Sequence, residues 1–154
     1  MGEVLDSMAY GFYVVGVTGD GEANGFTANW VSQASFDPPH VTVAVHKDHH
    51  SHGLIESGGV FSINLLDKGQ EDLARRLARH QEPEGDSVAG ARFTRGPQTG
   101  APLFEEAFAH LECRVVDGLD AGDHTVFLGE VVGEELRRRG QLLTNQETSL
   151  HYEE

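Results

Sequence analysis

Residues 24–46 read NGFTANWVSQASFDPPHVTVAVH, and we expect this segment to form three closely spaced stretches of extended chain. The pair Asp20-Gly21 lies just before them and favours a hairpin turn, because an Asp-Gly pair tolerates positive φ. Pro38-Pro39 ends the second stretch, since proline cannot donate to a strand ladder. From Val41 to His46 apolar residues recur at every second position, which is typical of a strand. We therefore expect antiparallel strands joined by short turns.

The rest of the chain continues this pattern of short strands and turns. Further strands are expected over residues 10–18, 60–66, 111–117 and 125–132, and helical segments over residues 3–10, 51–57 and 70–80. Residues 81–102 are polar and rich in Gly and Pro, which predicts a long loop with one short strand at residues 91–94. One more short strand is expected from Leu142 onward. Six or seven strands with short helices predict a mainly β, antiparallel barrel with peripheral helices, and residues 1–154 are expected to form a single domain.

The chain carries 11 basic and 25 acidic residues, a formal net charge of −14. Such a surface repels phosphate backbones and anionic lipid, so we expect neither nucleic acid nor a membrane as a partner. The single cysteine, Cys113, excludes an internal disulfide and a cysteine-rich metal site, and its place on an alternating strand predicts a core position. The first residues show no signal-peptide pattern, and a cytoplasmic location is expected.

Small hydroxyl and amide side chains surround Trp30, the only tryptophan, within residues 25–39. Backbone N–H groups beside small side chains can approach a flat ligand closely, and such a site suits a cofactor ring such as a flavin. An ordinary polar strand and turn has the same composition, and composition alone favours that interpretation.

Four histidines fall within residues 46–52, which read HKDHHSH and follow a predicted strand. Lys47, the histidines, Ser51 and the free N–H groups of the following helix offer the donors of a phosphate site. A solvated loop is the plain alternative. A metal site is a weaker interpretation, because no carboxylate or cysteine with matching spacing lies nearby.

Gly122-Asp123-His124 is expected in the turn of the last hairpin. The imidazole either caps the turn in solvent or lies over a cofactor, where it suits hydrogen bonding or proton transfer. The spacing does not decide between the two.

Taken in order, these segments resemble the flavin reductase-like, FMN-binding split-barrel family, and especially the flavin reductase module attached to some flavodiiron proteins. The resemblance runs from about residue 10 to residue 152 and rests on residues 24–39, 43–48, 59–66, 111–113, 122–124, 128–131, 147–148 and 151–152. It implies a six-stranded antiparallel split barrel that forms a homodimer, with FMN near the subunit interface, FAD as a possible replacement and NAD(P)H as the reductant.

The resemblance also implies roles for individual residues. The flavin ring and ribityl chain would be flanked by Thr27, Ala28, Asn29, Trp30 and Ser32. The phosphate would be held by His46, Lys47, His50 and Ser51. Asn64 would lie beside the cofactor, and His124 would be the catalytic residue near the nicotinamide. The chain departs from many family members at His49, His50 and His52, which replace a Ser/Thr-rich loop, and no metal site is expected.

The function expected from this resemblance is an NAD(P)H-dependent flavin reductase that passes electrons to a flavin, a metal ion, a partner protein or oxygen. The alternative is an FMN-binding electron-transfer protein without a productive nicotinamide site, reduced by a redox partner protein. A flavin-free module that binds haem or another planar ligand is the third hypothesis.

Overall fold

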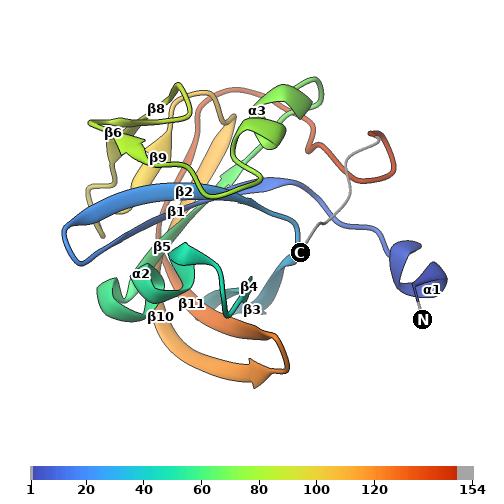
Figure 1. Ribbon diagram of the computed structural model, residues 1–154, viewed down its shortest axis with the longest axis horizontal. Coiled ribbons are helices and arrows are strands. Elements are labelled where there is room, and N and C mark those ends of the chain that lie inside the picture. Colours follow the sequence, from blue (N-terminus) through green and yellow to red (C-terminus); the bar gives the residue numbers. More distant parts are fainter. Residues whose placement is uncertain (1, 149–154) are drawn as a thin grey trace.

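The computed structural model describes residues 2–148 and consists mainly of antiparallel β-strands (Figure 1). In chain order the elements are α1 (Glu3–Asp6), β1 (Tyr13–Gly19), β2 (Glu22–Ala28), β3 (Val31–Phe36), β4 (Pro39–His46), α2 (His50–Gly58), β5 (Val60–Leu65), α3 (Glu71–Arg76), β6 (Pro83–Glu84), β7 (Ser87–Val88), β8 (Ala91–Arg95), β9 (Pro102–Phe104), β10 (Ala109–Ala121) and β11 (His124–Leu136). None of the described helices is long and apolar enough to cross a membrane.

The main sheet has the strand order β2-β1-β5-β10-β11-β4-β3, and a smaller sheet has the order β6-β7-β8-β9. The first half of β10 pairs with β5, whereas the first half of β11 pairs with β4. The long β10–β11 hairpin therefore joins the two sides of the main sheet. The mainly β, antiparallel prediction is confirmed, although the main sheet contains seven strands within the described residues rather than six.

Residues 81–102 differ from the expected long loop. They contain β6, β7 and β8, of which only β8 was expected, and β8 pairs with β9 to complete the small sheet. Tight turns at Gly85 and Gly90, both with positive φ, allow such short strands to reverse direction. The buried side chains of Val88 and Phe93 hold them against the core.

Two groups of buried side chains form the core. One group lies around Val15, Val43 and Phe61 and includes Cys113, and the other lies around Leu66 and Phe104. Burial raises the pKa of the Cys113 thiol to about 12, which keeps it protonated at neutral pH. The expected core position of Cys113 is confirmed.

The helix expected over residues 70–80 is shorter in the structure, because its end is bound by β2. The Thr27 hydroxyl donates to the Ala74 carbonyl at 2.7 Å, and the Thr27 N–H donates to the Leu77 carbonyl at 2.8 Å. These bonds satisfy carbonyls that a longer helix would use internally. The segment after Leu142 also differs, since its described part forms only isolated bridges at Leu142 and Thr144 instead of a strand.

The Asn64 side chain connects three strands inside the molecule. It is fully buried, and its amide donates to the Val14 carbonyl of β1 at 3.0 Å and to the Ser62 hydroxyl of β5 at 2.9 Å. Its carbonyl oxygen accepts the Phe104 N–H of β9 at 2.9 Å. A buried N–H without an acceptor is costly, so Asn64 holds the small sheet on the large one.

We expect Asn64→Ala to lower the free energy of unfolding by about 2–3 kcal/mol, because it leaves the Phe104 N–H buried without an acceptor. Urea denaturation at equilibrium measures this loss. Gln33→Ala on the exposed strand β3 is the control, with an expected change within about 0.5 kcal/mol. Equal midpoints for the two variants would show that Asn64 does not brace the sheets.

Candidate functional site

Three of the predicted site residues meet where β4 ends and the β10–β11 hairpin turns. His46 pairs in register with His124, and their rings lie 5.1 Å apart between centroids. The Trp30 ring lies 4.7 Å from the His124 ring. His124 is 3% exposed, whereas Trp30 is 43% exposed. The structure thus forms a small aromatic cluster in which Trp30 is the partly exposed member.

The turn itself is short, because β10 ends at Ala121 and β11 begins at His124. Gly122 has a φ of 73°, which glycine adopts without strain and which suits a two-residue hairpin turn. His124 is therefore the first residue of a strand and points inward, rather than lying in an exposed turn. This burial argues against the first interpretation of this motif, in which the imidazole is exposed to solvent in the turn.

Lys47 contacts the same turn through its backbone and its side chain. Its N–H donates to the Asp123 carbonyl at 2.8 Å, and its ammonium group forms an ion pair with the Asp120 carboxylate. The hydrogen bond from Lys47 lowers the pKa of Asp120 below its ordinary value. A phosphate that binds Lys47 must compete with Asp120, a residue that the sequence analysis did not single out.

The start of α2 turns His49 and His50 toward β2 and toward His80, which follows α3, whereas His52 contacts Thr125 and Phe127 of β11. The His49 ring caps the helix by accepting the Ser51 N–H at Nδ1, at 3.1 Å, and packs on Phe26. His50 Nε2 lies 2.8 Å from the Glu22 carboxylate, and its ring lies 4.3 Å from that of His80. Ser51 is buried. One helix N–H is thus already capped, and His50 is already paired with an acidic side chain.

Burial lowers the pKa of His49 to about 4, with smaller contributions from the nearby histidines His80, His50 and His46. His49 is therefore neutral at pH 7, which leaves Nδ1 free of a proton and able to accept the Ser51 N–H.

Residues 27–32 separate into structural and accessible positions. Thr27 binds α3 and Ala28 is buried, whereas Ser32 is exposed on β3. Asn29 is buried, and its Oδ1 has no hydrogen-bond partner among the described residues. A buried acceptor without a partner is uncommon in folded proteins, and Asn29 directly precedes the half-exposed Trp30 in the chain.

Asn64 does not join this cluster. The structure places it fully buried, with both amide hydrogens donated and its oxygen bonded to Phe104, so it presents no accessible polar group to a cofactor. The pattern that suggested a ligand contact marks a structural bridge instead. The sequence around Asn64 was ambiguous, because a polar residue within an apolar strand is typical both of a ligand contact and of a structural bridge.

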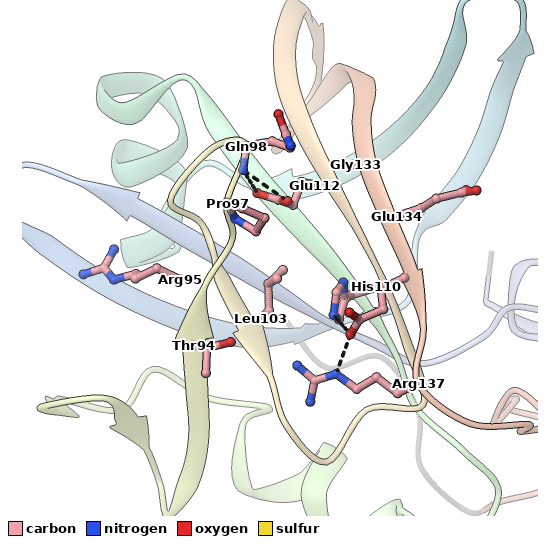
Figure 2. A pocket seen from close by; sticks show the side chains of 11 residues that line it. Thr94, Arg95, Pro97, Gln98, Leu103, His110, Glu112, Gly133, Glu134 and Arg137 are labelled. Carbon is pink, nitrogen blue, oxygen red and sulfur yellow. Dashed lines mark hydrogen bonds and ion pairs between the residues drawn. The ribbon is translucent and has the colours of Figure 1, made fainter.

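A cleft of about 280 Å³ lies at the opposite end of the β10–β11 hairpin (Figure 2). Buried Glu112 accepts hydrogen bonds from the backbone of Gln98 and from the backbone and hydroxyl of Thr99. His110 Nε2 and Arg137 Nε lie 3.1 and 3.3 Å from the same oxygen of Glu135. Burial lowers the pKa of His110. No predicted site residue lines this cleft.

The sequence analysis missed the polar residues of the cleft. The alternation that places Leu111 and Cys113 on one face of β10 necessarily turns His110 and Glu112 to the other, which was the available signal. Within residues 2–148, no group of three or more His, Cys, Asp or Glu side chains is placed to hold a metal ion.

Comparison with known proteins identifies the family. Residues 5–152 match the model of the flavin reductase like domain, and the chain belongs to this family. It is 39% identical over 128 residues to an NADH-dependent FAD reductase of Streptomyces globisporus, covering 80% of this chain and 70% of that protein.

A solved structure shows the same fold relationship. The NADH:FAD oxidoreductase of Streptomyces globisporus C-1027 superposes with a TM-score of 0.82 at 34% identity, covering 92% of this chain and 83% of that one. A second structure of that protein, in complex with NAD and FAD fragments, gives a TM-score of 0.81. The chain is also 36% identical to a putative diflavin flavoprotein of Synechocystis. The match covers 81% of this chain but only 20% of that protein.

We expect the stability of the protein to fall as the pH is lowered from about 6.5 to about 4, in part through His49. The unfolded chain binds the His49 proton near the ordinary pKa, whereas the folded protein resists it until about pH 4, so protons favour unfolding over this interval. Urea denaturation of wild type and His49→Asn at about pH 7 and about pH 5 measures the difference.

Asparagine is a good N-cap residue that does not titrate, so His49→Asn should lose less stability on acidification than wild type. His49→Ala, which removes the cap as well, should be less stable than His49→Asn by about 1 kcal/mol at both pH values. An equal loss on acidification in wild type and His49→Asn would contradict the assignment.

Proposed function

We propose that this protein is an NAD(P)H-dependent flavin reductase whose flavin binds against Trp30, beside His124. The observation that carries the proposal is the aromatic cluster at the hairpin turn, in which a half-exposed indole packs on a buried imidazole. The unsatisfied Oδ1 of Asn29, next to Trp30 in the chain, supports it. Membership of the flavin reductase like family and the named activity of the Streptomyces relative point to the same chemistry.

Each residue of the cluster has a distinct part in this proposal. Trp30 offers an apolar surface on which a planar ring can stack. Asn29 Oδ1 accepts a hydrogen bond from the ring edge, and His124 lies where it can bind or orient the nicotinamide. A bound flavin supplies the hydride and electron chemistry, while the protein supplies position and electrostatics.

We propose FMN as the preferred flavin, with its phosphate near Lys47 and the start of α2. FAD is the alternative flavin, because the Streptomyces relative is named as an FAD reductase. The support for Lys47 is its place beside the aromatic cluster in a chain with a net charge of −14, where positive groups are scarce. Its present partner, Asp120, is exposed, and exposed ion pairs contribute little, so a phosphate can replace Asp120.

We further propose a homodimer, and the support is a set of exposed apolar side chains. Phe36 on the edge strand β3 is 89% exposed, and Trp30, Val116 and Leu119 are exposed as well. A second copy of the chain would cover such side chains close to the candidate flavin site. The redox partner protein, the cytoplasmic location and the single-domain organisation expected from the sequence stay predictions.

We expect FMN and FAD to quench the fluorescence of Trp30, which is the only tryptophan and lies at the proposed binding face. Titration of the purified protein with each flavin measures both affinities and shows which flavin is preferred. The matched variant Trp30→Phe keeps an aromatic surface and gives the background emission without Trp30, and free tryptophan titrated in parallel corrects for absorption by the flavin. Undiminished Trp30 emission with both flavins would contradict this site.

We expect NADH or NADPH to bleach the visible absorption of protein-bound flavin much faster than that of free flavin, because the protein holds donor and acceptor together. Rapid mixing of the flavin-loaded protein with each nucleotide measures the rate. A rate equal to that of free flavin would reject the reductase and favour the electron-transfer protein reduced by a partner. His124→Ala should retain flavin but slow the reduction.

A further inference from the structure

We propose that Asp123 is a positioning residue that fixes the orientation and the tautomer of His124. Asp123 Oδ1 lies 2.7 Å from His124 Nδ1, and its other oxygen, Oδ2, lies 3.9 Å from Nε2 of His46. One carboxylate thus lies between two imidazoles that belong to paired residues of neighbouring strands. The part of the proposal that concerns hydride transfer rests on the proposed function, whereas the tautomer does not.

The charge of Asp123 determines where the protons of both rings lie. The hydrogen bond from His124 lowers the pKa of Asp123 below its ordinary value, so the carboxyl group is ionised at neutral pH and only accepts hydrogen bonds. His124 must therefore carry a proton on Nδ1, and Nε2 is its proton-accepting nitrogen when the ring is neutral.

His46 is held in the opposite tautomer. Its Nδ1 accepts the Asp48 N–H at 3.1 Å, which places the proton of the neutral ring on Nε2, the nitrogen that faces Asp123. Both imidazoles consequently turn an N–H toward the same carboxylate. Asp123 is in turn fixed by its own backbone, whose carbonyl accepts the Lys47 N–H at 2.8 Å.

This arrangement resembles other sites in which a carboxylate orients a functional histidine. The carboxylate selects the tautomer and restrains the ring, and it acts through the histidine without touching the reacting atoms. His124 packs on Trp30, so any rotation of its ring would disturb the face at which we place the flavin. Asp123 therefore sets which nitrogen of His124 serves the site.

The test compares Asp123→Asn and Asp123→Ala with Asp117→Asn, which changes an exposed carboxylate on the same hairpin that contacts neither histidine nor Lys47. Long-range proton–nitrogen NMR of histidine-labelled protein reads the tautomer of His124 directly. We expect the Nδ1–H form in wild type and in Asp117→Asn. We expect it to be lost in Asp123→Ala, because that variant removes the carboxylate that holds the proton on Nδ1.

The kinetic comparison separates positioning from a merely structural role. Asp123→Ala and Asp123→Asn should reduce kcat for flavin reduction by about tenfold or more, with KM for the nucleotide and flavin affinity within about twofold of wild type. Asp117→Asn should leave kcat unchanged. Retention of the Nδ1–H form in Asp123→Ala would overturn the proposal, and so would a lost tautomer with unchanged kcat. A wild-type protein without reductase activity would reject the proposed function, while the NMR comparison would still decide the tautomer.

Discussion

The pairing of β10 with β11 is the constraint on which the rest of the structure depends. Each strand has 13 residues, and together they link β5 on one side to β4 on the other. Register shifts between Glu112 and Cys113 and between Val115 and Asp117 mark irregularities, which bend and twist a strand. The bend allows the hairpin to pair with one half of the sheet near its open end and with the other half near its turn (Figure 1).

The two ends of this hairpin carry different chemistry. At the turn, His124 lies opposite His46 and against Trp30, which is partly exposed. At the open end, His110 and Glu112 lie in the polar cleft. Acidic residues outnumber basic ones in this chain, and Lys47 has an acidic partner in Asp120. The phosphate that we propose at Lys47 would therefore bind by exchange with this carboxylate.

Sequence patterns predicted the elements that depend on local chemistry. Alternation of apolar residues predicted β4 and β5, and the Asp20-Gly21 turn predicted the first hairpin. The order of motifs predicted the family, which the comparison confirmed. The predicted helix over residues 70–80 was too long, because a residue distant in the chain forms hydrogen bonds with its backbone carbonyls. Thr27 ends α3 by binding its carbonyls, and no local pattern in residues 70–80 contains that information.

The sequence by itself determined that the chain is mainly β, and it predicted Trp30, Lys47 and His124 as residues of a flavin site. It also determined which face of β10 is apolar, because side-chain alternation is a property of the strand alone. Only the tertiary structure decided how those residues are used. It turned Asn64 inward as a bridge, paired Lys47 with Asp120 and placed Asp123 between two imidazoles. The physical reason is that hydrogen bonds and ion pairs depend on distances of a few ångströms, and these distances are set by how strands, turns and sheets pack together in the folded protein.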